Sequence, residues 1–136
     1  VASREAEAFG RASAEAQAAE RPVIVADRGA LPETLVPVRC SGDEGTGWLV
    51  APDDADALAA CLENALRLSP ETLARMGARG RAHVMSQFTT RGMQSATLEV
   101  YDALLGSRLA EFFRDATSEN PADKSMHVPD GTAAFT

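Results

Sequence analysis

The sequence predicts an α/β fold, namely a partial Rossmann-like domain with a short parallel sheet and several helices. Two short apolar runs, residues 22–26 and 48–51, alternate with segments of helical composition. This alternation is typical of parallel β/α packing. A doubly wound sheet usually has about five or six strands, so two strands predict the back half of such a domain.

The first half of the chain carries both predicted strands. Residues 1–9 are typical of the end of a strand and a loop, and residues 10–19, rich in Ala, Glu and Gln, predict a helix. The run PVIVA at 22–26 predicts a buried parallel strand. Residues 27–38 contain a glycine and two prolines and predict a loop with at most one helical turn. A second loop, SGDEGTG at 41–47, precedes the strand WLVA.

The second half of the chain is predicted to be helical. Capping signals mark three helix starts: Asp53 or Asp54, Ser69 before Pro70, and Thr89 or Thr90. Apolar residues recur at helical spacing in each helix and are expected to face the core, Cys61 and Tyr101 among them. Gly106 ends the third helix, residues 107–118 predict a short amphipathic helix, and residues 119–136 predict a disordered tail.

Composition excludes some classes of function. The chain of 136 residues has a net charge of −7, which argues against nucleic-acid binding, since phosphate contacts need clustered Lys and Arg. Cys40 and Cys61 stand far apart and predict free thiols in a reducing compartment, the cytoplasm. His83 and His127 have no Cys or Asp at metal-ligand spacing, so no metal site is predicted.

Two carboxylates flank a predicted helix start in the stretch EAFGRASAE. Glu7 precedes a break at Phe9-Gly10, and Glu15 lies in the first turns of the helix that follows. The first N–H groups of such a helix have no partner within it, and they attract phosphate by hydrogen bonds and by the helix dipole. Carboxylates accept hydrogen bonds from vicinal hydroxyls. This layout suits a ligand with hydroxyls on both sides of a diphosphate, as in a nucleotide sugar.

Three blocks of the chain resemble glycosyltransferase family 4, whose members have the two-domain GT-B fold. EAFGRASAEAQAAERPVIVADRGALPET resembles the family's E-x7-E segment with its P-V-I strand and G-G-x-P-E loop. TGWLVAPDDADALAACLENAL and LARMGARGRAHVMSQFTTRGMQSATLEVYDALL resemble the blocks that follow. The resemblance covers residues 3–105. It implies that residues 1–105 are the C-terminal half of a nucleotide-sugar-binding domain and that residues 106–118 form a crossover-type helix.

The resemblance also implies a role for each matching residue. Glu7 is expected to be catalytic, contacting the hydroxyls of the transferred sugar and stabilising its oxocarbenium-like transition state. Glu15 is expected to hold the ribose hydroxyls of the donor. Backbone N–H groups are expected to bind the sugar and the diphosphate at four substrate-binding positions: Phe9, Gly10, Arg11 and Ala12. The family retains the anomeric configuration and generally needs no bound metal or cofactor, so the helix dipole and basic side chains stabilise the leaving diphosphate.

The chain departs from the family pattern in two respects. Ala30 stands where the second glycine of G-G-x-P-E is usual. The family's diphosphate-gripping Arg–Lys pair and its N-terminal acceptor domain match no part of the chain, so we expect a truncated enzyme that is inactive alone. We expect this fragment to be marginally stable or to self-associate, because strands of the parent sheet would lose a neighbour. The Arg after F-G and the Gln after E-A resemble enzymes of bacterial cell-envelope glycan assembly, which act in the cytoplasm or at the inner face of the membrane.

Other interpretations stay open on the sequence alone. Glu7 is also explained as a helix-start acid stabilised by the dipole, and Glu15 and Arg11 as a solvated or ion-paired helix face. For the chain as a whole, the alternatives are a non-catalytic nucleotide-sugar-binding module and a nucleotide-sugar epimerase of the GT-B fold.

Overall fold

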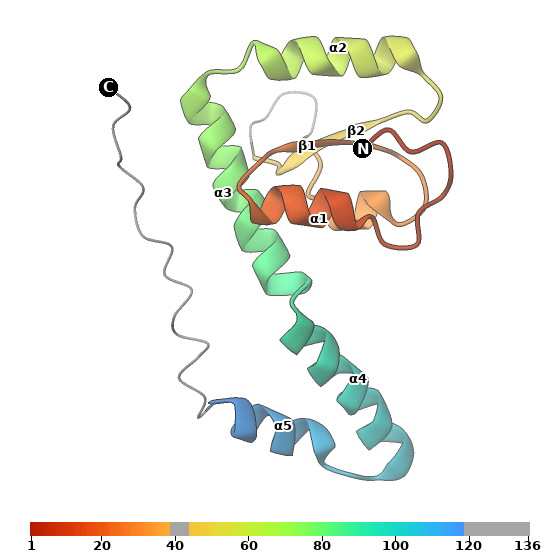
Figure 1. Ribbon diagram of the computed structural model, residues 1–136, viewed down its shortest axis with the longest axis vertical. Coiled ribbons are helices and arrows are strands. Elements are labelled where there is room, and N and C mark those ends of the chain that lie inside the picture. The colour runs from red at the N-terminus through yellow and green to blue at the C-terminus, as the bar shows by residue number, and fades with distance from the viewer. Residues whose placement is uncertain (39–43, 119–136) are drawn as a thin grey trace. The chain divides into compact units, whose positions relative to one another are not determined.

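The computed structural model describes residues 1–38 and 44–118 and divides the chain into two compact units, Val1–Gly92 and Met93–Thr136 (Figure 1). The predicted α/β fold with a short parallel sheet is confirmed. The domain boundaries that the family resemblance implies stay a prediction. The sequence predictions that fall outside the described residues concern Cys40, His127, the loop residues 41–43 and the tail at 119–136.

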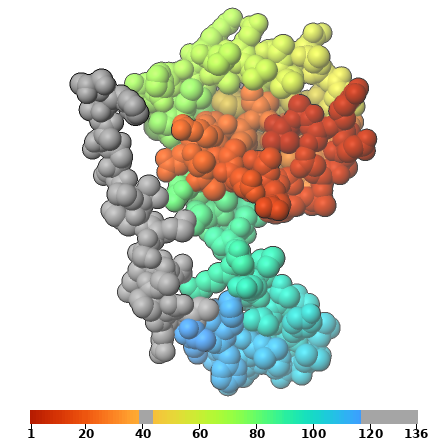
Figure 2. All heavy atoms as spheres, viewed as in Figure 1, coloured from red at the N-terminus to blue at the C-terminus, as the bar shows by residue number. Residues whose placement is uncertain are grey.

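The first unit contains the sheet and the helices around it. Its elements in chain order are α1 (Arg11–Ala18), β1 (Val23–Ala26), the 3-10 turn η1 (Leu31–Thr34), β2 (Gly47–Val50), α2 (Ala55–Leu66) and α3 (Pro70–Gln87). The helix expected at 10–19, both strands, and the single helical turn between them are therefore confirmed. In the space-filling view, residues 1–10 and α1 form part of the surface of this unit (Figure 2).

β1 has hydrogen-bonded neighbours on both of its edges. It runs parallel to β2, with Val23 opposite Gly47 and Ala26 opposite Val50. On the other edge the N–H of Ala26 donates to the carbonyl of Val1 at 3.0 Å. The sheet of the described residues has two strands, β1 and β2, so the strand end expected within residues 1–9 is not formed, although Val1 is hydrogen-bonded to the other edge of β1.

An aliphatic core joins β1 to the turn that follows it. Val23, Val25, Leu31 and Leu35 pack together, and Val25 and Leu31 are fully buried. Full burial of such a side chain stabilises a fold by roughly 1.5–3 kcal/mol. This core therefore fixes η1 against the strand and, through it, the loops near the carboxyl end of β1.

The three predicted helix caps are confirmed, including that of α4 (Thr90–Leu105). Each cap accepts a backbone N–H from three residues further on: Asp54 from Ala57 at 2.8 Å, Ser69 from Thr72 at 3.2 Å, and Thr89 from Gly92 at 3.0 Å. Such a bond satisfies one of the free N–H groups at a helix start.

Some residues expected in the core are exposed instead. No residue of α2 is buried; Leu62 and Leu66 are 45% and 82% exposed, and Cys61 is only half-buried. Tyr101 in α4 is 50% exposed. The core assignments of Cys61 and Tyr101 were therefore wrong. Helical spacing shows which face of a helix is apolar, but it does not show what covers that face.

Two glycines of α3 allow α1 to approach closely. A Cβ at Gly77 would lie 2.0 Å from the carbonyl oxygen of Glu20, just after α1. A Cβ at Gly80 would lie 3.3 Å from Cγ of Gln17. The close approach of the two backbones means that α3 supports the C-terminal half of α1.

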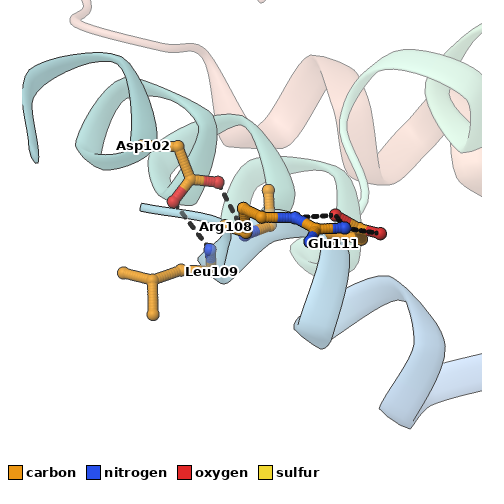
Figure 3. A network of polar contacts seen from close by, with 5 residues as sticks. Asp102, Arg108, Leu109 and Glu111 are labelled. Carbon is orange, nitrogen blue, oxygen red and sulfur yellow. Dashed lines mark hydrogen bonds and ion pairs between the residues drawn. The ribbon is translucent and has the colours of Figure 1, made fainter. Parts of the chain in front are cut away.

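In the second unit, α4 is followed by α5 (Leu109–Ser118), and one carboxylate organises the corner between them (Figure 3). Gly106 ends α4 with a φ of 63°, as predicted. Asp102 accepts hydrogen bonds from Ser107 Oγ at 2.6 Å and from the N–H groups of Leu109 and Ala110 at 2.7 and 2.9 Å. The Ser107 hydroxyl, followed by these amides, lowers the pKa of Asp102. Asp102 is therefore the N-terminal cap of α5.

An ion pair lies beside this cap at the start of α5. The guanidinium of Arg108 contacts the carboxylate of Glu111 at 2.6 Å through two nitrogens (Figure 3).

None of the described helices is both long enough and apolar enough to cross a membrane.

Candidate functional site

The predicted break before α1 is present at Gly10. This residue has φ 81° and ψ 50°, a left-handed conformation, and α1 begins at Arg11. A Cβ at Gly10 would lie 2.6 Å from Cδ2 of Leu31. Glycine is therefore required here both by the turn and by its packing on η1. No side chain of the described residues caps the start of α1, which leaves its first N–H groups to other acceptors.

The loop that carries Glu7 lies against the loop after β1. The N–H of Ala30 donates to the carbonyl of Glu7 at 3.0 Å, and a Cβ at Gly29 would lie 2.6 Å from the same oxygen. Gly29 has a φ of 61°, whereas Ala30 has a φ of −84°, which any residue adopts. Alanine in place of the family's second glycine thus costs no backbone strain.

The two predicted carboxylates have different local partners. Glu7 is half-buried and accepts a hydrogen bond from the hydroxyl of Ser3. Glu15 is exposed and forms an ion pair with Arg11 at 3.2 Å, one turn earlier on α1. An exposed pair of this kind contributes about 0.3–0.5 kcal/mol. Glu15 and Arg11 are brought together, while Glu7 is held separately in the preceding loop.

Of the other predicted site residues, Ala12 is exposed and Phe9 packs against an aromatic ring. Ala12 is exposed in the first turn of α1. The ring of Phe9 meets that of Phe88 edge to face, with centroids 5.4 Å apart, and Phe88 meets His83 in the same way at 5.7 Å. Nε2 of His83 is buried without a hydrogen-bond partner in the described part of the chain. Phe88, which follows α3, therefore supports the loop before Gly10.

A buried polar network that the sequence did not reveal joins α1 to η1. Ser13 and Gln17 of α1 are fully buried and Thr34 of η1 is 1% exposed. The hydroxyls of Ser13 and Thr34 lie 2.8 Å apart, and Nε2 of Gln17 donates to the carbonyl of Thr34 at 2.7 Å. The sequence feature that could have indicated this network is the spacing of Ser13 and Gln17, which are four residues apart in an Ala-rich helix and therefore on one face.

A cavity of about 270 Å³ lies at the carboxyl ends of both strands, where parallel sheets bind ligands. Ser3, Arg4 and the turn after β2 contribute to its lining, whereas the six predicted site residues do not. Arg28 ties these segments together: it forms an ion pair with Asp53 at 2.8 Å and donates to the carbonyl of Arg4. Ser3 lines the cavity and also binds Glu7, so cavity and carboxylate are neighbours.

The described side chains and amides differ in the ligands that they suit. Across residues 1–38 and 44–118, no three His, Cys, Asp or Glu side chains gather closely enough to hold a metal ion. Burial raises the pKa of the Cys61 thiol, which favours its protonated, unreactive form. The uncapped amides of α1 are suited to an anionic oxygen.

Comparison with solved structures assigns the class. A glycosyltransferase from Rickettsia africae ESF-5 superposes with a TM-score of 0.66 at 30% identity, over 79% of this chain and 27% of that one. Together with the parallel sheet and the loops at its carboxyl end, this likeness shows that the chain has the fold of part of a GT-B glycosyltransferase.

Residues 1–83 match the family described as glycosyl transferases group 1, and the chain belongs to this family. A D-inositol 3-phosphate glycosyltransferase of Streptomyces scabiei is 42% identical over 99 residues, 73% of this chain and 20% of the relative. An MMP alpha-(1->4)-mannosyltransferase of Mycolicibacterium hassiacum is 34% identical over 96 residues, 71% of this chain and 22% of the relative. The chain thus spans about a fifth of the length of these relatives.

Proposed function

We propose that this chain is the donor-binding portion of a retaining glycosyltransferase of family 4, which moves a sugar from a nucleotide-diphosphate sugar to an acceptor. The observation that carries the proposal is the left-handed turn at Gly10, which starts α1 without a cap between the Glu7 loop and Glu15. Both curated relatives are named as enzymes that transfer a sugar.

The diphosphate binds at the start of α1. The N–H groups of Arg11 and Ala12 lie in its first turn, where the helix dipole favours negative charge. The N–H groups of Phe9 and Gly10 extend the same cradle toward the sugar. When the bond to the anomeric carbon breaks, the leaving diphosphate gains charge, and donors fixed in advance stabilise it at no further reorganisation cost.

The two carboxylates bind the hydroxyls on either side of the diphosphate. Glu15, one turn into α1, accepts hydrogen bonds from the ribose, and exposure lets it exchange Arg11 for this ligand. Glu7, fixed by Ser3 and Ala30, faces the transferred sugar and stabilises its positive, oxocarbenium-like transition state. Retention of configuration follows from the resemblance to family 4.

The proposal also covers the full enzyme and its place in the cell. The full enzyme pairs this portion with an N-terminal acceptor domain, and the chain alone is inactive; its share of about a fifth of its relatives' length supports this. The enzyme needs no cofactor and acts in bacterial cell-envelope glycan synthesis, in the cytoplasm or at the inner face of the membrane.

Titration of UDP, GDP and ADP into the isotope-labelled chain tests the proposal. We expect one of them to bind with a Kd below about 1 mM, and its diphosphate to shift the amide resonances of Arg11 and Ala12. Adenosine, which has the ribose and no phosphate, is the control and should leave these amides unchanged. Binding weaker than millimolar for all three nucleotides contradicts the proposal.

A further inference from the structure

The element η1 supports the segments on both sides of the Gly10 turn. Ala30, immediately before η1, binds the carbonyl of Glu7 at 3.0 Å. Leu31, the first residue of η1, fills the space beside Gly10, and it is fully buried. The Glu7 loop and the start of α1 therefore contact the same four-residue element, and its position sets their separation.

The donor and the acceptor of each hydroxyl hydrogen bond between α1 and η1 can be assigned. Thr34 Oγ1 donates its one proton to the carbonyl of Leu31 at 2.7 Å, so it must accept from Ser13 Oγ, 2.8 Å away. Ser13 Oγ in turn accepts from Nε2 of Gln17 at 3.3 Å. Each hydroxyl is both a donor and an acceptor, and the network ends on the residue that packs on Gly10.

We propose that Thr34 is a positioning residue that fixes the first turn of α1 against the Glu7 loop. Its hydroxyl is the only atom of this network that bonds to both Ser13 and Leu31. Without it, the Ser13 proton would lose its partner in a buried site, and a shift of α1 away from η1 would let that proton reach another acceptor. The consequence for ligand binding rests on the function proposed above.

The substitution Thr34→Val removes the hydroxyl and keeps the shape of the side chain. Thr34→Ser keeps the hydroxyl and is the rescue variant. Ser13→Ala removes the same bond from the α1 side. Leu58→Ala is the control for lost stability, because Leu58 is half-buried in α2, outside the core that contains Leu31.

Amide hydrogen exchange of the four variants and the parent chain measures the position of the first turn without any ligand. The N–H groups of Ser13 and Ala14 donate to the carbonyl of Gly10 at 3.0 and 3.4 Å and report this turn. The N–H of Asp27, bonded to Val50 at 2.8 Å, is the reference within the sheet. We expect Thr34→Val and Ser13→Ala to speed exchange of the reporters roughly tenfold relative to this reference, and Thr34→Ser and Leu58→Ala to leave the ratio unchanged.

Nucleotide titration separates this inference from the proposed function. If a nucleotide binds the parent chain, Thr34→Val should weaken it roughly tenfold while the folded population stays above nine-tenths, and Thr34→Ser should restore it. If no nucleotide binds but the exchange ratios change as stated, the proposed function fails and the positioning role stands. Unchanged exchange ratios in both Thr34→Val and Ser13→Ala overturn the inference, whatever the nucleotides do.

Discussion

The rings of Phe9 and Phe88 meet edge to face, with their centroids 5.4 Å apart and their planes at 79°. Such a pair contributes about 0.5–1.5 kcal/mol beyond its buried area. We predict a coupling free energy of this size in a double-mutant cycle of Phe9→Leu and Phe88→Leu. Urea unfolding followed by the fluorescence of Trp48, the chain's single tryptophan, measures it. Additivity of the two changes within about 0.3 kcal/mol means that Phe88 does not support the loop.

Gly10→Ala should destabilise the first unit by about 2–4 kcal/mol. The left-handed φ of 81° costs a residue with a Cβ roughly 1–2 kcal/mol, and the contact of 2.6 Å with Leu31 adds an overpacking cost of similar size. Trp48 fluorescence during urea unfolding gives the free energy. A loss below about 1 kcal/mol shows that Leu31 moves aside and that the glycine is not required for packing.

Ala30→Gly is the reverse substitution, alanine to glycine, in the loop that contacts the Glu7 loop. Ala30 has an unstrained backbone, so the family's glycine relieves nothing there and increases the entropy of the unfolded chain. We predict a loss of about 0.4–1 kcal/mol of unfolding free energy in the same assay. A gain in stability indicates strain at Ala30 that its φ of −84° does not show.

The features that the sequence predicted correctly are local in the chain. The caps Asp54 and Ser69 bond to groups three residues away, and the turn at Gly10 follows from a residue type that tolerates positive φ. Thr34 and Ser13 were not found because they are 21 residues apart and meet only after α1 packs on η1. A hydroxyl in a helix is ordinarily on the solvent side, and its burial depends on a partner that periodicity does not reveal.

The stability of the first turn of α5 should depend on pH, because the carboxylate of Asp102 accepts hydrogen bonds from its N–H groups. Its folded pKa is lowered, first by the Ser107 hydroxyl, so this carboxylate stabilises the corner above the ordinary Asp pKa of about 3.9. The contribution is lost as pH falls through the lower folded value. We expect the amide resonances of Leu109 and Ala110 to move toward unfolded positions on acidification below about pH 4.

Asp102→Asn should weaken the same cap near neutral pH, because the amide keeps one acceptor oxygen where the carboxylate offers two oxygens to three donors. Asp56→Asn, at an exposed acid of α2, is the matched control. Unaltered Leu109 and Ala110 resonances in Asp102→Asn at neutral pH exclude Asp102 as the cap of α5.

Self-association of the chain should depend on apolar side chains of its second unit. Leu104 and Leu105 are 75% and 72% exposed, and removing such surface from water is favourable by about 25 cal/mol per Å². We predict concentration-dependent sedimentation at micromolar concentrations, reduced by Leu104→Ser combined with Leu105→Ser. Ala103→Ser, also exposed on α4, should not reduce it. A parent chain that sediments as a monomer and melts in one sharp transition contradicts the prediction.

Two ion pairs of nearly identical geometry allow the ribose role of Glu15 to be tested. Glu15 pairs with Arg11 at 3.2 Å on α1, and Glu63 pairs with Arg67 at 3.3 Å at the end of α2; in both pairs the residues are four apart and exposed. Glu15→Gln and Glu63→Gln therefore each remove one negative charge from an exposed ion pair of similar length. If Glu15 binds ribose hydroxyls, Glu15→Gln should weaken nucleotide binding about tenfold, because a hydrogen bond to a charged group contributes about 1.5–3 kcal/mol. Glu63→Gln should change the Kd by less than about twofold.

Changing the nucleotide, in place of the protein, tests the same proposed hydrogen bond. Removing the 2′-hydroxyl, by titrating the 2′-deoxynucleotide, takes away the other end of the proposed bond. In the parent chain and in Glu63→Gln, the deoxynucleotide should bind more weakly than the ribonucleotide. In Glu15→Gln the two should bind with nearly equal Kd, because the partner of the hydroxyl is already gone. An equal preference for the ribonucleotide in all three proteins means that the hydroxyl is held elsewhere, and Glu15 then has no role beyond its ion pair with Arg11.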